Sequence, residues 1–308
     1  MTGSVVVLAG GTGGAKLARG MLEVTGAEDL VVVANIGDDV EIYGAYVSPD
    51  PDLVAFWLAD RIDARGWGLA GDTFAVMDGL RELGAQAWFR LGDRDLAIGI
   101  ERARALAGGA TLTEAHAAIC RALGVGARVL PASDLPVRTR VMAHNRWWPF
   151  QEFMIRARGA GPVQEVDFRG ASAAPATAAV LEAIATARAI VIGPSNPVVS
   201  IEPILRVRGM RAALLESTAP VVAVSPLVNG QVLKGPTAAF MRWAGHPLDS
   251  GGVAAAYAGL LDGLVADEET DGLPVLATSV LMDSPAARRR LAQETLEFAL
   301  ALGAQARP

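Results

Sequence analysis

The sequence is poor in cysteine, in charged residues and in long apolar runs, and each shortage excludes a class of protein. Cys120 is the single cysteine among 308 residues, so the chain can form no internal disulfide bond and a cysteine zinc site is unsupported. No apolar run reaches the roughly 18 residues of a membrane span, and no signal peptide is visible. We therefore expect a cytoplasmic protein with no membrane partner.

The charge balance and the histidines narrow the chemistry further. The formal net charge is −6, without the basic surplus of a general nucleic-acid binder, so we expect no nucleic-acid partner. The three histidines show no metal-binding spacing, and no Gly-x-Ser-x-Gly element or Cys/His pair points to a covalent nucleophile. Because 52% of the residues are hydrophobic, the chain can still build a large core.

What the sequence does have is a glycine-rich turn between an apolar segment and a helix, VVVLAGGTGGAK at 5–16. The β-branched run at 5–8 is typical of a buried strand, and we expect the helix over 15–25. Glycines let backbone N–H groups approach an anion, and the positive end of a helix dipole favours it. The dinucleotide pattern G-x-G-x-x-G and the P-loop pattern are both absent, so the turn predicts phosphate binding without naming the ligand. A tight strand-to-helix turn with no ligand is the alternative.

Apolar runs separated by helical segments predict an α/β fold, a Rossmann-like and mostly parallel sheet with helices on both faces. A second strand is expected over 30–35 and a helix over 53–62, since Pro49 and Pro51 argue against helix before it. Short strands and turns over 127–170 predict an inserted, antiparallel β-rich lobe. The nucleotide-binding core would then comprise residues 1–126 and 171–308.

Three loops at predicted strand ends, 10–16, 193–197 and 225–237, share glycine, proline, serine, asparagine and lysine. The carboxyl ends of parallel strands lie along one edge, so these loops can cradle one nucleotide, although turn formation explains the same residues. Four carboxylates crowd two nearby loops. They suit Mg²⁺ beside a phosphate, while helix capping accounts for some of them. They are Asp38, Asp39, Asp50 and Asp52.

A further loop combines arginine and aspartate with aromatic residues. Arg90, Asp93, Arg94 and Asp95 follow Trp88-Phe89. They form either a salt-bridged surface loop or a site for an anionic or aromatic ligand, bound by stacking and bidentate hydrogen bonds.

With these motifs in view, the chain resembles the 2-phospho-L-lactate transferase family of coenzyme F420 biosynthesis, which includes phosphoenolpyruvate transferases. The resemblance covers nearly the whole chain. It rests on LAGGTGGAKLARGM at 8–21, VVVANIGDD at 31–39, SPDPDLV at 48–54, GDTF at 71–74, LGDRDLA at 91–97, LPASDLPVRT at 130–139, IGPSNPVVSIEPIL at 192–205 and SPLVNGQVLKGP at 225–236.

The resemblance implies a reaction. A GDP-linked three-carbon acid, phospholactyl or phosphoenolpyruvyl, is attacked by the terminal ribityl hydroxyl of the deazaflavin Fo. GMP leaves, a phosphodiester forms, and Mg²⁺ is the expected cofactor. Direct transfer fits a chain without a covalent nucleophile, since in-line phosphoryl transfer needs mainly positioning and charge neutralisation.

The same resemblance implies roles for individual residues. Gly11, Thr12, Gly13, Gly14 and Lys16 would hold the guanosine nucleotide, joined by Ser195 and Asn196. Asp52 and Arg90, with Arg94 beside it, would contact Fo. Asp38, Asp39 and Asp50 are the metal candidates, and Asp50 and Asp52 the catalytic ones.

This chain departs from the family pattern at two places, and two other functions stay open. Pro51 stands where leucine is common, and Gly99 lies where a histidine is common nearby. An NAD(P)-dependent oxidoreductase is supported by the glycine turn alone, and a non-catalytic nucleotide-binding regulator remains conceivable. Apolar helices near the C-terminus favour a homodimer. The sequence does not discriminate phospholactate, phosphoenolpyruvate and 3-phosphoglycerate donors.

Overall fold

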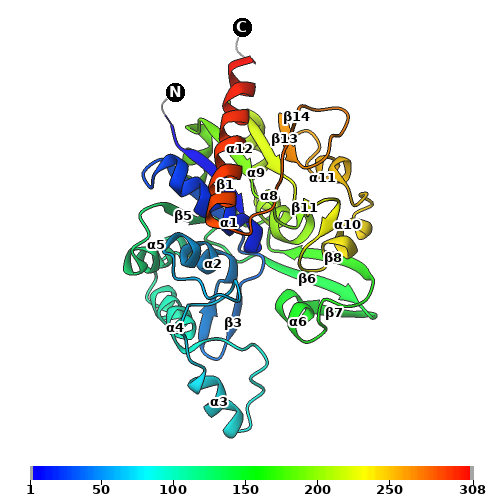
Figure 1. Ribbon diagram of the computed structural model, residues 1–308. Helices are drawn as coiled ribbons and strands as arrows, with labels where there is room; N and C mark the ends of the chain where they lie inside the picture. Colours follow the sequence, from blue (N-terminus) through cyan, green and yellow to red (C-terminus); the bar gives the residue numbers. More distant parts are fainter. Residues whose placement is uncertain (1–2, 306–308) are drawn as a thin grey trace.

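The computed structural model of the chain describes residues 3–305, so residues 1–2 and 306–308 of the predicted core lie outside the described residues. A seven-stranded parallel sheet forms the centre, in the order β14-β13-β10-β9-β1-β2-β5 (Figure 1). Its strands are β1 (Val5–Ala9), β2 (Leu30–Ala34), β5 (Arg128–Pro131), β9 (Ala189–Ile192), β10 (Val221–Val224), β13 (Gly263–Ala266) and β14 (Val275–Ala277). The predicted α/β class with a Rossmann-like parallel sheet is confirmed.

Helices surround this sheet and connect its strands. They are α1 (Gly11–Thr25), α2 (Pro49–Leu58), α3 (Ala75–Glu82), α4 (Asp93–Ala107), α5 (Leu112–Leu123), α6 (Phe150–Ile155), α7 (Ala178–Ala185), the π-helix η1 (Pro197–Ile201), α8 (Glu202–Arg206), α9 (Met210–Glu216), α10 (Thr237–Trp243), α11 (Ser250–Ala256) and α12 (Pro285–Gln305).

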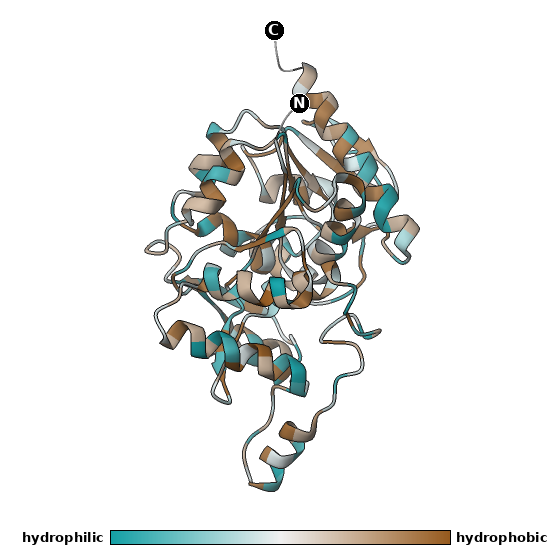
Figure 2. Cartoon of the chain, turned by 90° about the vertical axis from the view of Figure 1, so that its left-hand side faces the viewer, coloured by the Kyte–Doolittle hydropathy of each residue, from teal (hydrophilic) through white to brown (hydrophobic). Residues whose placement is uncertain are grey.

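Both faces of the sheet are buried, which explains why its strands are continuous apolar runs. Along β1, Val5, Val7 and Ala9 pack with α1, α2 and α12 in one cluster, while Val6 and Leu8 pack with α7, α8 and α9 in another. Successive side chains of a strand point to opposite faces, so an apolar residue is needed at every position. Figure 2 shows strands coloured as hydrophobic inside the molecule, surrounded by helices that contain both hydrophilic and hydrophobic residues.

Three small antiparallel sheets complete the fold. They are the hairpin β3 (Val40–Ile42)–β4 (Ala45–Val47), the hairpin β11 (Leu227–Val228)–β12 (Gln231–Val232), and a three-stranded sheet in the order β7-β6-β8. The last consists of β6 (Arg138–Ala143), β7 (Arg146–Pro149) and β8 (Val163–Arg169). The predicted antiparallel sheet is therefore present, but β5 pairs with β2 in the main sheet. The division into a core and a lobe stays a prediction.

Two helices begin earlier than the sequence pattern predicted. The first helix was expected from residue 15 but starts at Gly11, so the glycines form its first turn. The second was expected over 53–62, and the argument that Pro49 and Pro51 exclude helix was wrong, because both lie in the first turn of α2. N–H groups there have no partner inside the helix, so a proline loses no hydrogen bond.

Candidate active site

The glycine turn lies at the point where the strand order reverses. The chain leaves β1 through α1 to β2 on one side, whereas β9 lies on the other side of β1. Loops that leave neighbouring strands in opposite directions open a crevice at their carboxyl ends, where α/β proteins bind ligands. The predicted loops 10–16 and 193–197 follow β1 and β9 at this end of the sheet and contact each other there.

Close packing between these two loops explains the glycines. A Cβ on Gly13 would overlap the carbonyl oxygen of Pro194, and one on Gly10 would approach the carbonyl oxygen of Ser200 to 2.5 Å. Ser195 accepts a hydrogen bond through Oγ from the Gly14 N–H at 3.0 Å. The loops are thereby held against each other by their backbones.

The N-terminus of α1 keeps two donors for an anion. Its first N–H, on Gly11, donates to Oδ1 of Asp50 at 2.8 Å. The N–H groups of Thr12 and Gly13 have no acceptor in the described part of the chain. Free N–H groups at the start of a helix bind phosphate or carboxylate oxygens.

Asp38 and Asp50, here called the acidic pair, are joined by one buried amide. Asn35 follows β2 directly, and its Nδ2 donates to Asp50 Oδ2 at 2.8 Å and to Asp38 Oδ1 at 3.2 Å. Its own Oδ1 accepts from the Gly37 N–H at 2.7 Å. Burial raises the pKa of Asp50 to about 6, and burial together with the Asp50 charge raises that of Asp38 well above its usual value. Two carboxylates held together by one amide group suit a divalent metal ion.

Asp39 accepts hydrogen bonds from hydroxyl groups and not from Asn35. Its Oδ1 accepts from Ser48 Oγ at 2.8 Å and its Oδ2 from Tyr46 OH at 3.1 Å. Across residues 3–305, no three His, Cys, Asp or Glu side chains are grouped so that they could hold a metal ion. The three predicted metal ligands therefore do not converge as one set.

Asp52 is engaged by a buried arginine that the sequence reasoning did not assign to the site. Arg102 of α4 is fully buried, and both of its terminal nitrogens bond to the two carboxylate oxygens of Asp52. Its Nη1 also donates to the carbonyl of Tyr46 at 2.9 Å. Asp52 is 3% exposed, so its predicted contact with Fo is not visible in this arrangement. The pair ties α4 to the start of α2.

The arginine–aspartate loop resolves into two helix caps. Asp72 accepts from the N–H groups of Arg94 and Asp95 at the start of α4, while Asp93 accepts from those of Ala75 and Val76 at the start of α3. The carboxylates of Asp72 in GDTF and Asp93 in LGDRD thus each accept from N–H groups in the first turn of the helix that follows the other motif. The exposed guanidinium of Arg90 lies over Phe74, and Arg94 is also exposed.

The remaining predicted nucleotide residues make partly local contacts. Lys16 donates through Nζ to the carbonyl of Met282 at 3.2 Å. Asn196 caps η1, its Oδ1 accepting from Val198 and Val199. Neither Asn35 nor Arg102 was given a role from the sequence. The position of Asn35 at the end of an apolar strand does predict that it lies beside the glycine turn, whereas nothing in the sequence marks Arg102 as buried.

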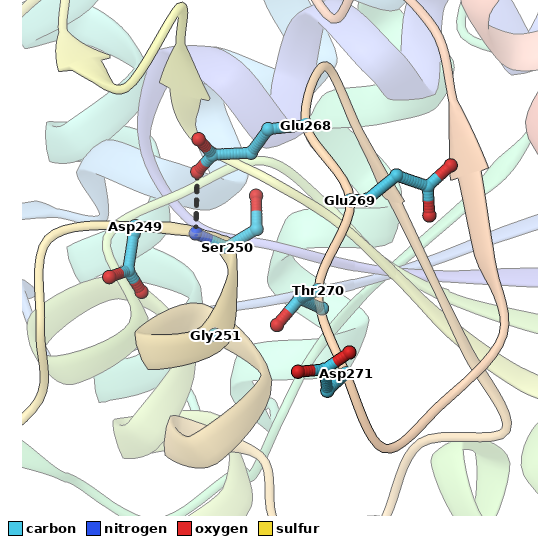
Figure 3. A pocket seen from close by; sticks show the side chains of 7 residues that line it. All are labelled: Asp249, Ser250, Gly251, Glu268, Glu269, Thr270 and Asp271. Atoms are coloured by element: carbon cyan, nitrogen blue, oxygen red, sulfur yellow. Dashed lines mark hydrogen bonds between the residues drawn. The ribbon is translucent and has the colours of Figure 1, made fainter.

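A separate pocket of about 400 Å³ lies between α11 and the loop after β13, lined by residues 249–251 and 268–271 (Figure 3). Two of its carboxylates act as helix caps. Glu268 accepts from the Ser250 N–H and Asp249 from the Gly252 N–H. Glu269 and Asp271 add further acidic groups, so the pocket repels a phosphate.

The family follows from comparison with known proteins. Residues 5–289 match the 2-phospho-L-lactate transferase CofD family. The chain is 40% identical to the 2-phospho-L-lactate transferase of Methanosarcina mazei, over 86% of this chain and 87% of that protein. It is 37% identical to the phosphoenolpyruvate transferase of Streptomyces griseus, over 96% and 98%.

Solved structures agree on the fold. A crystal structure of a protein from Bacillus halodurans superposes with a TM-score of 0.57 at 17% identity, covering 95% of this chain and 91% of that one. Within the described residues, each helix is too short or too polar to cross a membrane. The family match leaves the oxidoreductase alternative without support. This chain belongs to the 2-phospho-L-lactate transferase CofD family.

Proposed function

We propose that the chain is a transferase of coenzyme F420 biosynthesis that moves a phospholactyl or phosphoenolpyruvyl group from a GDP-linked donor to the terminal ribityl hydroxyl of Fo, releasing GMP. The observation that carries this proposal is the acidic pair at the N-terminus of α1, beside the free N–H groups of Thr12 and Gly13. A phosphate and a divalent cation fit next to each other there.

The acidic pair would hold Mg²⁺. Asp38 and Asp50 offer carboxylate oxygens within reach of one amide group, and Mg²⁺ typically takes one or two protein carboxylates with water and substrate phosphate. Asp39, whose two oxygens already accept from hydroxyl groups, would position the pair instead. When bound, the ion would neutralise the charge of the transferred phosphoryl group.

The protein's own groups would orient the two substrates. Thr12 and Gly13 would donate N–H groups to donor phosphate oxygens, and the close contact with Pro194 and Ser195 keeps that turn rigid. A carboxylate oxygen of Asp38 or Asp50 would accept the proton of the attacking hydroxyl. Asp52 would act through Arg102, which holds the first turn of α2 in place. Arg90 and Arg94 remain proposed Fo contacts.

A direct assay tests the reaction. Purified protein is incubated with Fo, Mg²⁺ and, separately, the GDP-linked phospholactyl, phosphoenolpyruvyl and phosphoglyceryl donors. We expect GMP and one phosphodiester product with at least one donor, and the preferred donor identifies the three-carbon acid. Tight nucleotide binding without product from any donor would favour the non-catalytic regulator and refute the transferase.

Asp50 is the residue whose replacement tests the site. We expect Asp50→Asn to lower turnover by about 100-fold or more, as is typical when a metal-binding or proton-accepting carboxylate is lost, with unchanged folding. Asp78→Asn is the matched control, because Asp78 is 61% exposed on α3 and pairs with Arg81. Equal turnover in Asp50→Asn and wild type contradicts the proposed role.

Light scattering of the wild-type preparation tests the proposed homodimer.

A further inference from the structure

The pocket between α11 and the loop after β13, here called the acidic pocket, has no part in the proposed transfer reaction. Residues 249–251 and 268–271 line it, and its volume of about 400 Å³ is large enough for a small organic ligand (Figure 3). The first range contributes one carboxylate and the second contributes three, and none of the seven lining residues is basic. The lining therefore favours a ligand with positive charge.

The negative charges of the acidic pocket are not balanced by cationic side chains. Asp249, Glu268, Glu269 and Asp271 form no ion pair within residues 3–305. Glu268 accepts from the Ser250 N–H at 2.8 Å and Asp249 from the Gly252 N–H at 2.7 Å, but these neutral donors leave both carboxylates charged. A bound cation would lower the repulsion among the four groups.

Ser250 gives an independent indication of a ligand. It is 1% exposed, and its Oγ has no hydrogen-bond partner in the described part of the chain. Figure 3 shows this hydroxyl at the start of α11, on the side that faces the loop 268–271. A buried hydroxyl without a partner is unfavourable, and an N–H group of a ligand would supply the missing hydrogen bond.

Gly251 keeps the space between the helix and the loop open. A Cβ at this position would lie 3.1 Å from Thr270 Oγ1 and 3.3 Å from Asp249 Oδ1. Gly251 is not among the glycines with positive φ, so its backbone conformation does not require glycine. The missing side chain matters here because it leaves a hydroxyl and a carboxylate oxygen facing the same space.

The arrangement of the carboxylates decides between kinds of cation. Among the described residues, no three His, Cys, Asp or Glu side chains converge closely enough to hold a metal ion. The carboxylates come from two segments on opposite sides of the pocket, and those of Glu269 and Asp271 are exposed to solvent. Separated negative groups match a ligand whose positive groups are also separated along a chain.

We propose that the acidic pocket binds a polyamine, a small organic cation with two or more ammonium groups. Its N–H groups donate to the carboxylates of Glu269 and Asp271 and to the Oγ of Ser250. Each ammonium group has three donors, and hydrogen bonds from it to a carboxylate are strengthened by charge.

Calorimetry with spermidine, without nucleotide or Fo, tests the site. We expect wild type to bind one spermidine per chain, and the double variant Glu269→Gln with Asp271→Asn to bind about tenfold more weakly or worse. Both residues lie in an exposed part of the loop, so these variants keep the fold.

Two further variants retain every carboxylate. Ser250→Ala removes the unpartnered acceptor, and Gly251→Ala fills the space beside Thr270 Oγ1. We expect each to weaken spermidine binding by about three- to tenfold. A hydroxyl that is merely unsatisfied in the folded protein would change stability in Ser250→Ala but not affinity.

Glu216→Gln is the matched control. Glu216 is exposed at the end of α9 and forms no ion pair in the part of the chain that the structure describes, so the variant removes one negative charge outside the pocket. Unchanged affinity in Ser250→Ala and Gly251→Ala, or equal weakening in Glu216→Gln, would overturn the proposal by showing attraction to the net charge alone. No spermidine binding, or calcium bound by the same carboxylates in its place, would overturn it too. The measurement contains no substrate, so failure of the transferase reaction would not affect it.

Discussion

At the scale of single residues, the missing side chain of Gly13 determines how closely two loops of the candidate site pack. Gly13 has no Cβ, and this lets the turn after β1 lie directly against the Pro194 carbonyl after β9. Gly11 adopts a positive φ of 63°, a conformation that favours glycine, and the N–H groups of Thr12 and Gly13 that follow it have no acceptor in the described part of the chain. The glycines were predicted to let an anion approach. They also let another loop approach.

Gly13→Ala should therefore damage both stability and binding. We expect a loss of about 3 kcal/mol or more in the free energy of unfolding, because the new methyl group meets backbone atoms that cannot rotate away. Urea unfolding and GDP affinity measure the two effects. Gly79→Ala on α3 is the control, since no heavy atom lies within 4 Å of its Cβ position, and it should be neutral or stabilising by up to about 1 kcal/mol. Equal stabilities for the two variants would contradict this account.

Arg102 gives a second prediction at this scale. Arg102→Met leaves the carboxylate of Asp52 buried without its partner and should cost about 3–5 kcal/mol of stability. Combining it with Asp52→Leu removes the stranded charge, so the double variant should be more stable than Arg102→Met alone. Chemical denaturation of Arg102→Met, Asp52→Leu and the double variant measures the three stabilities. A double variant less stable than Arg102→Met would show that the ion pair does not control this region.

At the scale of elements, the interface between α2, α4 and α5 holds a histidine that must stay neutral. α5 begins with a capping box between Thr111 and Glu114. Farther along, His116 is fully buried with its Nδ1 3.8 Å from Asp52, and burial followed by the charge of Arg102 lowers its pKa to about 3. His116 is thus part of the packing behind the site.

This histidine makes stability depend on pH. In the unfolded chain His116 is protonated below about pH 6.5, whereas in the folded chain it stays neutral down to about pH 3. The unfolded state therefore binds more protons in this range, and the contribution of His116 to folding stability is lost as the pH falls. The raised pKa values of Asp38, Asp39 and Asp50 act in the opposite direction, so wild type must be compared with His116→Gln at each pH.

The stability difference, wild type minus His116→Gln, should fall by about 1.4 kcal/mol for each pH unit between 6.5 and 4.5. Urea denaturation over this range measures it. A difference that does not change with pH would mean that His116 titrates normally in the folded protein.

At the scale of the whole molecule, helix α3 projects from the body that contains the central sheet, and it is here called the arm. Helix α3 extends away from the body of the protein in both views (Figures 1 and 2). Met77 is its one buried residue, and Val76 and Leu83 at its two ends are 45% and 85% exposed. The arm connects to the site through α4, whose Arg102 holds Asp52.

The arm should open far more readily than the sheet. We expect amide hydrogens of α3 to exchange with solvent faster by orders of magnitude than those of β1 and β2, because few buried contacts hold the helix in place. Hydrogen exchange followed by mass spectrometry resolves the two regions. Similar protection of α3 and the central strands would imply a partner surface that covers the arm.

The sequence by itself determined the sheet and where its ligand end lies. A strand with apolar side chains at every position is stable only if both faces of its sheet are buried. The apolar runs Val5–Ala9 and Leu30–Ala34 therefore predicted a parallel sheet covered on both faces. Glycines at a strand end and aspartates after the next strand indicated the candidate site, and the sequence motifs indicated the family. These features could be predicted because the apolar runs of strands and the composition of turns depend on residues that are close together in the sequence.

The tertiary structure decided which charged groups meet. Asp38 and Asp50 share Asn35, Asp39 turns to Tyr46 and Ser48, and Asp52 pairs with an arginine 50 residues away. The pairing of β5 with β2 in the main sheet was likewise decided by the tertiary structure. A buried charge is stabilised by an opposite charge or destabilised by a like charge on another element. Which of the two it meets depends on distances in space, and these cannot be read from positions in the sequence.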